Sequence, residues 1–156
     1  MRSLAIFVIA FLQLVLADPA PPGLAYLYTV NVTLGDAIDV GLGPKGTRIV
    51  IPITGGTFSG PKLSGNVLNV GADWGLADRN GTFSPDSRYQ LQTDDGANIF
   101  IQTNGPLQPD NTTHLRVTFE TGNADYYWVN NVLAVGILRS GTGYVVIDTW
   151  QLTTTA

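Results

Sequence analysis

Asp73 combines an ionisable group with a setting that could support acid–base chemistry. It ends an apolar, strand-like segment and directly precedes Trp74. Alternation along a strand places Asp73 on one face with mostly small or apolar residues, namely Leu63, Gly65, Val67, Asn69 and Gly71. Burial on such a face would raise the pKa of the carboxyl, which suits a general acid or base. The alternative is a turn-forming aspartate that caps Gly75 and Leu76.

Glu120 is the second candidate catalytic acid. It shares a predicted strand face with His114, Arg116 and Thr118, so a solvated ion pair with Arg116 is the alternative interpretation. His114 is the only histidine, and the chain contains no cysteine. A histidine cluster, a thiolate metal site and a thiol nucleophile are therefore excluded, and we expect neither a metal nor a cofactor.

Aromatic side chains are frequent near the ends of the predicted strands and could line the mouth of a barrel. A mostly apolar, aromatic cavity with a few directed polar groups is the usual form of a small-molecule site. The candidate substrate-binding residues are Trp74, Tyr89, Phe100, Tyr127, Trp128 and Asn130.

The elements that would position these residues alternate with period two, which is typical of β-strands. In the first segment one face carries Leu24, Tyr26, Tyr28, Val30, Val32 and Leu34. The predicted strands are Leu24–Leu34, Thr47–Thr54, Leu63–Trp74, Ser87–Thr93, Asn98–Thr103, Thr113–Thr121, Val132–Arg139 and Tyr144–Thr153. Pro52 places the second strand at an edge or a bulge. A short helical turn is expected over Asn123–Asn130.

The segment Asp94-Asp95-Gly96-Ala97 lies between two alternating runs and predicts a hairpin. About eight strands joined by short turns indicate an all-β fold, and a single antiparallel up-and-down β-barrel is favoured because closure removes exposed edges. The sequence leaves open whether Asp73 or Trp74 faces the interior, since one residue of register exchanges the two faces.

The 156 residues are divided into a signal peptide and one domain. Residues 1–17 have a positive start, an apolar run too short for the ~20 residues of a membrane span, and small residues before the expected cleavage. Residues 18–156 form the predicted barrel. Sequons at Asn31, Asn80 and Asn111 predict glycosylation in the secretory pathway or outside the cell. The net charge of −4 and the absence of a Lys/Arg cluster in the sequence argue against a nucleic-acid-binding surface.

An ordered series of motifs resembles the DUF3237 (UPF0311) family of small β-barrel proteins and covers the chain from about Leu24 to Leu152. The matching segments are Gly55–Pro61, Gly65, Gly71–Trp74, Arg88-Tyr89, Thr93–Ala97, Phe119–Gly122 and Tyr127–Asn130. The resemblance implies a closed or nearly closed antiparallel barrel with these motifs gathered at one end. The signal peptide and sequons resemble those of small secretory-pathway proteins of fungal natural-product pathways, which implies hetero-Diels–Alder chemistry by analogy.

The sequence therefore leads to three hypotheses. The first is a cofactor-independent enzyme that dehydrates a hydroxylated tropolone-type precursor to a quinone-methide-like diene and directs its hetero-Diels–Alder addition to a terpene alkene. The second is a secreted carrier that binds a ligand without chemistry, and the third is a structural glycoprotein with a filled barrel. The expected partner is a small apolar, oxygenated natural product rather than nucleic acid or, after signal cleavage, a membrane. Homo-oligomerisation is left open.

Overall fold

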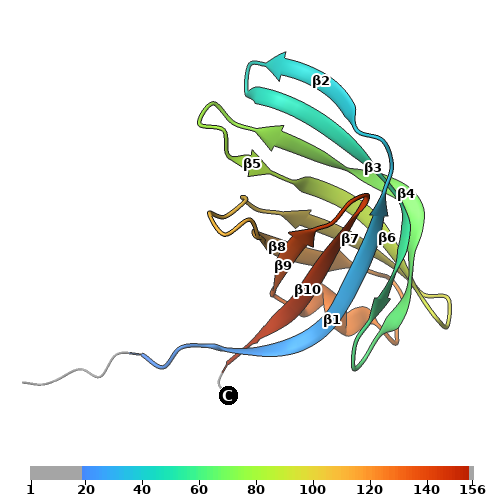
Figure 1. Cartoon of the computed structure of the whole chain (residues 1–156). Coiled ribbons are helices and arrows are strands. Elements are labelled where there is room, and N and C mark those ends of the chain that lie inside the picture. Colours follow the sequence, from blue (N-terminus) through green and yellow to red (C-terminus); the bar gives the residue numbers. More distant parts are fainter. Residues whose placement is uncertain (1–18, 155–156) are drawn as a thin grey trace, which may run out of the picture.

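The computed structural model describes residues 19–154, which form a closed antiparallel β-barrel (Figure 1). The expected signal peptide lies outside the described residues. The strands are β1 (Gly23–Leu34), β2 (Ile38–Gly43), β3 (Gly46–Ser59), β4 (Ser64–Ala77), β5 (Phe83–Ser84), β6 (Asp86–Thr93), β7 (Asn98–Asn104), β8 (Thr113–Glu120), β9 (Ala134–Ser140) and β10 (Tyr144–Thr153). Within residues 19–154, no helix is long and apolar enough to cross a membrane.

The strand order is β2-β3-β1-β10-β9-β8-β7-β6-β4-β5, and an additional pairing of β3 with β4 closes the sheet. Eight strands thus form the barrel, each beside its neighbour in the chain. Strands β2 and β5 pair only with β3 and β4 respectively, and they extend the wall beyond the rim at the top of Figure 1. The fold class expected from the sequence, an up-and-down barrel of about eight strands, is confirmed.

The local predictions hold for the barrel strands. The hairpin of β6 and β7 turns through Asp94–Ala97, where Gly96 has a φ of 91°, a left-handed conformation that glycine adopts readily. A register shift between Pro52 and Gly56 confirms the bulge expected at Pro52. The sequence analysis missed β2 and β5, because both are short additions outside the barrel.

The prediction that Leu24 and Tyr26 share the inward face of the first strand is wrong, because β1 contains a bulge. The pairing with β10 shifts between Tyr26 and Tyr28, so Leu27 turns inward and is only 2% exposed. Tyr26 and Leu24 are then 43% and 58% exposed. From Tyr28 onward, the expected alternation continues toward the barrel interior.

One end of the barrel is closed and filled. Tyr28 lies in its core, with edge-to-face contacts to Phe58 and Phe119 at ring-centroid distances of 5.8 and 6.2 Å. Below them, the 3₁₀ helix η1 (Tyr127–Asn131) covers the end and buries Val129 completely. The predicted helical turn is therefore present, although it begins later than expected. Filling this half leaves the other half of the barrel free to hold a ligand.

Candidate functional site

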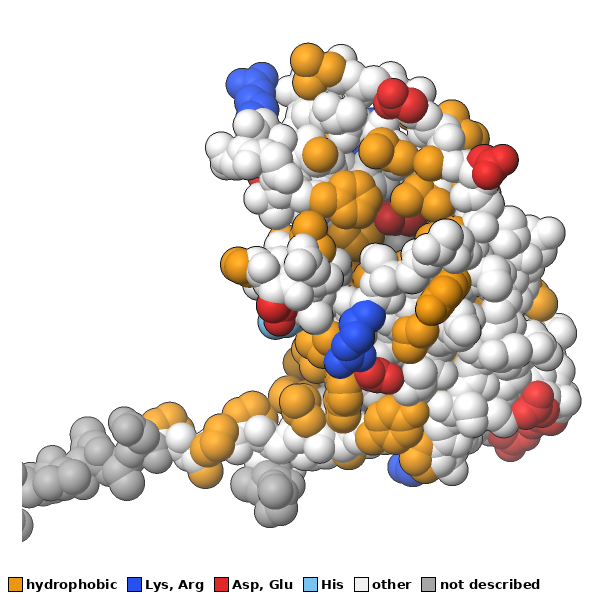
Figure 2. All heavy atoms as spheres, in the orientation of Figure 1, with side chains coloured by type: hydrophobic (Ala, Val, Ile, Leu, Met, Phe, Trp, Pro, Cys, Tyr) orange, Lys and Arg blue, Asp and Glu red, His pale blue; other side chains and the backbone are white. Residues whose placement is uncertain are grey.

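The open half of the barrel contains a cavity of about 420 Å³. Hydrophobic side chains gather in the hollow below the extended strands (Figure 2). All eight barrel strands contribute to the lining, together with β5 and three loop residues. The lining residues are Val32, Leu34, Ile51, Ile53, Asp73, Phe83, Pro85, Ser87, Tyr89, Thr103, Leu107, Thr113, Leu138, Ser140, Gly141, Tyr144, Val145 and Ile147. The volume lies within the range of natural small-molecule sites.

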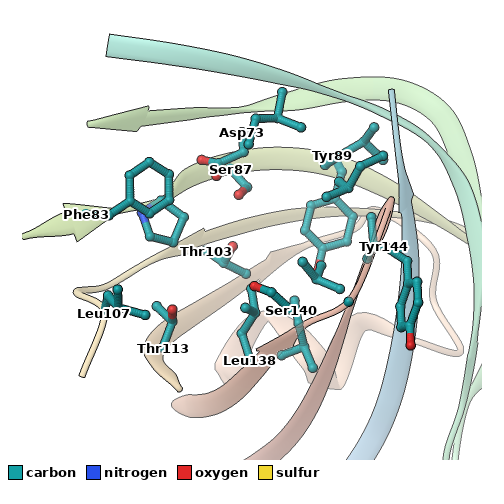
Figure 3. A pocket seen from close by; sticks show the side chains of 18 residues that line it. Asp73, Phe83, Ser87, Tyr89, Thr103, Leu107, Thr113, Leu138, Ser140 and Tyr144 are labelled. Carbon is teal, nitrogen blue, oxygen red and sulfur yellow. The ribbon is translucent and has the colours of Figure 1, made fainter. Parts of the chain in front are cut away.

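Asp73 projects into this cavity from β4 (Figure 3). Between Val67 and Gly71, β4 has two more residues than the segment of β6 with which it pairs. Because the number of extra residues is even, Asp73 lies on the same inward face as Val67. The backbone N–H of Asp86 donates a hydrogen bond of 2.8 Å to Asp73 Oδ1. The structure thus answers the open question of register: Asp73 faces inward and Trp74 faces outward.

The environment of Asp73 favours its protonated form. Burial raises the pKa of the carboxyl above its ordinary value, and this is the largest effect. Hydrogen bonds from the Asp86 amide and the Ser87 hydroxyl lower the pKa by less. The charge of the Asp86 side chain raises the pKa slightly further, and that of Arg48 lowers it. A carboxyl whose pKa is raised by burial at the wall of an apolar cavity is a suitable proton donor.

Two hydroxyl groups continue the polar surface from Asp73. Ser87 on β6 pairs with Asp73 across the sheet, and Thr103 on β7 pairs with Ser87. All three line the cavity, and Figure 3 shows the Asp73 and Ser87 oxygens directed toward each other. These residues form a line of hydrogen-bonding groups on one wall.

Phenol groups form the floor between the cavity and the filled half. Tyr89 lines the cavity, and its pKa is raised well above the usual value by burial and then by the neighbouring Tyr28. Burial also raises the pKa of Tyr28, while the neighbouring Thr149 and Tyr89 hydroxyls lower it by less. The Thr149 hydroxyl lies near that of Tyr28 without forming a well-shaped hydrogen bond, and it is fully buried. Both phenols therefore stay neutral and can donate hydrogen bonds.

The structure brings only two of the predicted site residues, Asp73 and Tyr89, to the cavity. Trp74 lies on the outer face, where the Arg88 guanidinium is 5.8 Å from its ring centroid. Glu120 and Phe100 face each other as a cross-strand pair, and their side chains point away from the barrel interior. Trp74, Glu120 and Phe100 are therefore not cavity-lining residues.

Tyr127, Trp128 and Asn130 belong to η1 at the closed end. Tyr127 is 58% exposed, and the Lys62 ammonium lies 5.4 Å from the Trp128 ring centroid. The Asn130 amide exchanges hydrogen bonds of 2.8 and 2.9 Å with the Thr121 backbone, which is a structural role. The expectation that the family motifs gather at one end is wrong, because Asp73 and η1 lie at opposite ends of the barrel.

The sequence analysis missed most of the lining, including Ser87, Thr103, Phe83 and Leu107. Ser87 and Thr103 carry a signal in the sequence, since each is a small polar residue on the inward face of its strand, beside large apolar or aromatic residues. Phe83 and Leu107 could not be found in this way, because they come from β5 and a loop outside the alternating runs.

The cavity suits an uncharged ligand. Asp73 is its only acidic lining residue, and the lining contains no lysine, arginine or histidine. Among the residues that the structure describes, no group of three or more His, Cys, Asp or Glu side chains is arranged to hold a metal ion. The chemistry that these side chains can perform is proton transfer and hydrogen bonding within an apolar space.

The comparisons with known proteins agree with this barrel. Residues 22–117 match the family described as "Protein of unknown function (DUF3237)". This chain belongs to the DUF3237 family. A β-barrel-like protein from Acinetobacter baumannii superposes with a TM-score of 0.80 at 34% identity, covering 87% of this chain and 99% of that one.

Some similar proteins are described as enzymes, whereas another is described only by its family. The hydroalkoxylation enzyme phnH of Penicillium herquei is 30% identical over 150 residues, which is 96% of this chain and 95% of phnH. The structure of an enzyme from the same organism matches with a TM-score of 0.76 at 29% identity, covering 87% of this chain and 98% of that one. A UPF0311 protein of Rhodopseudomonas palustris is 31% identical over 144 residues, covering 81% of this chain and 94% of its own length.

Proposed function

We propose that this protein is a cofactor-independent enzyme of secondary-metabolite biosynthesis that forms an oxygen-containing ring on an apolar substrate. The observation that carries the proposal is the single carboxyl of Asp73, desolvated in a cavity that is otherwise apolar or neutral. A raised pKa increases the protonated fraction of the acid at a given pH, and a positioned acid contributes about 10²–10⁴-fold to a rate. The similarity to a hydroalkoxylation enzyme supports a reaction of this type.

The first candidate reaction is an intramolecular hydroalkoxylation. Asp73 donates its proton to one alkene carbon, and the substrate hydroxyl oxygen bonds to the other carbon. The proton of that hydroxyl then returns to the Asp73 carboxylate, so the acid is regenerated and the product is an isomer of the substrate. The apolar walls hold the hydroxyl and alkene close together, which lowers the entropic part of the barrier.

The second candidate is the dehydrative cycloaddition expected from the sequence. Here Asp73 protonates the hydroxymethyl oxygen of a tropolone-type precursor and water leaves, while the ring hydroxyl proton passes to the Asp73 carboxylate, which gives a neutral quinone-methide-like diene and regenerates the acid. The diene then adds to a terpene alkene by a hetero-Diels–Alder reaction. The cavity volume of about 420 Å³ and its broad apolar surface favour this candidate, because they provide space for parts of two reactants.

Product mass distinguishes the two reactions. The purified protein is incubated either with a phenol that carries a neighbouring alkene or with a hydroxymethyl tropolone plus humulene. A hydroalkoxylase gives a cyclic isomer of unchanged mass, whereas a cycloaddition gives an adduct that has lost water. Asp73→Asn should remove the rate enhancement. Rates equal to a protein-free control in both assays would remove the proposed activity, and ligand binding without turnover would identify a carrier.

We also propose that the protein is a secreted glycoprotein. The side chains of Asn31, Asn80 and Asn111 are all exposed, as attachment of a glycan requires. Asn31 lies on the outer face of β1, and the other two lie in turns. Expression in a eukaryotic secretory host should give protein in the medium whose mobility shifts on treatment with an N-glycosidase. Intracellular, unmodified protein would contradict this proposal.

A further inference from the structure

Asp73, Ser87 and Thr103 form an inward-facing row across three adjacent strands. Asp73 on β4 pairs with Ser87 on β6, and Ser87 pairs with Thr103 on β7. Apolar residues bound the row on both sides: Ile51 pairs with Asp73 at one end, and Val117 pairs with Thr103 at the other. Because neighbouring strands lie ~4.8 Å apart, the row spans about 10 Å. This length is comparable with that of a small fused-ring molecule.

The opposite wall of the cavity is mainly apolar, although Ser140 of β9 and Tyr144 of β10 also line it. In the closed barrel, β9, β10 and β1 lie across from β4, β6 and β7. Their lining side chains are mainly aliphatic and include Val32, Leu34, Leu138, Val145 and Ile147. A ligand between the two walls therefore meets hydrogen-bonding groups on one edge and hydrocarbon on the other.

The charges around the row favour a neutral ligand. Arg48 acts on Asp73 through its charge without lining the cavity, and the Asp86 carboxylate is bound to Arg88 at 3.3 Å. An anionic ligand would meet the Asp73 carboxyl with no cation in the lining to compensate. Leaving a charge unpaired in an apolar site is costly.

We propose that Ser87 and Thr103 orient the ligand, so that a neutral molecule lays its oxygen-bearing edge along the row and its hydrocarbon face on the apolar wall. Thr103 is the positioning residue at the end of the row away from Asp73. Ser87 connects the two because it pairs with Asp73 on one side and with Thr103 on the other. This inference rests on the proposed function in taking the cavity as the reaction site, but binding alone tests it.

The test compares the affinities of 2-naphthol and naphthalene by ligand-observed NMR. Thr103→Val keeps the shape of a side chain that is 2% exposed and removes its hydroxyl. Thr103→Ser retains a hydroxyl. Thr113→Val is the matched control, because Thr113 lines the same cavity with 3% exposure but pairs with Leu138, outside the row.

We expect the wild type to prefer 2-naphthol by about tenfold, the value of one net hydrogen bond. Thr103→Val should reduce this ratio to near one, while Thr103→Ser and Thr113→Val should retain it. The absence of a preference in the wild type, or an equal loss in Thr113→Val, would overturn the role of Thr103.

Naphthalene-2-sulfonate, a permanent anion, tests the charge argument. It should bind at least about tenfold more weakly than 2-naphthol, and Asp73→Asn should reduce the difference. Equal binding of the anion by the wild type would overturn the inference of a neutral ligand. These outcomes are separate from the proposed reaction: the binding ratios can hold without turnover, and turnover can occur while Thr103→Val leaves the ratios unchanged.

Discussion

Asp73 and Ser87 face each other across adjacent strands of the barrel wall, with both side chains directed into the cavity. The residue before Ser87 also donates its backbone amide to Asp73 Oδ1, over 2.8 Å. Strand β6 thus fixes the carboxyl from two consecutive positions. The acid is held by regular sheet geometry rather than by a loop, which gives it a defined direction toward a ligand.

Replacement of Asp73 by asparagine should abolish most of the proposed activity. The amide oxygen can still accept the Asp86 hydrogen bond, but the side chain can no longer donate an acidic proton. We expect kcat to fall by at least about 100-fold with little change in KM. Steady-state turnover measures this. Asp86→Asn, which leaves the backbone donor in place, should keep activity within about threefold; equal losses in both variants would contradict the assignment.

The raised pKa of Asp73 also predicts a pH dependence of stability. Because folding raises this pKa, protonated Asp73 is favoured in the folded state. The stabilising contribution is fully present below the unfolded pKa of ~3.9 and is lost as pH rises through the folded pKa.

Asp73→Asn should therefore gain stability relative to the wild type as the pH rises from ~3.9 through the folded pKa. Each unit of pKa difference corresponds to about 1.4 kcal/mol in the free energy of unfolding. Urea unfolding at several pH values measures the difference between the two proteins. A constant difference across this range would show that the pKa of Asp73 is the same in the folded and unfolded chains.

The positions of Leu138 and Trp74 give a third prediction. Leu138 lies on the apolar wall of the cavity, whereas Trp74 lies outside it. Leu138→Ala should raise KM by about tenfold through lost apolar contact. Trp74→Phe should leave KM unchanged. Turnover measurements over a range of substrate concentrations check both, and a larger effect at Trp74 would place the substrate on the outer face.

Gly71 is expected not to tolerate a residue that has a side chain. It has a φ of 106°, and a Cβ at this position would lie 2.1 Å from the Arg88 carbonyl oxygen of the neighbouring strand. Gly71→Ala should lower the free energy of unfolding by more than about 2 kcal/mol. Gly122→Ala is the control, because nothing lies within 4 Å of its added Cβ. Urea denaturation compares them; equal stabilities would contradict the close approach.

The sequence was sufficient for the barrel because strand alternation and turn residues are local signals. It could not determine which residues share the cavity. Leu24 and Tyr26 were placed on the wrong face because the bulge at Leu27 changes the parity of β1. At Asp73 the irregularity is even, so Asp73 stays on the face of Val67, although the sequence alone left open whether Asp73 or Trp74 points inward.

The candidate site was harder to predict because its members are distant in sequence. Tyr127 and Trp128 are aromatic residues of the kind that often line ligand sites, but they belong to η1, which covers the closed end. Phe83 reaches the cavity because Gly75 leaves room for its ring, which would lie 2.3 Å from a Cβ at that position. Such tertiary relationships leave no periodic pattern in the chain.

A crystal structure with a bound substrate or product tests the central claim most directly. The proposed site predicts a ligand inside the barrel, with an oxygen or alkene carbon next to the Asp73 carboxyl and the hydrocarbon face against β1, β9 and β10. A ligand bound instead at the η1 end, among Tyr127, Trp128 and Glu120, with the cavity empty, would contradict it.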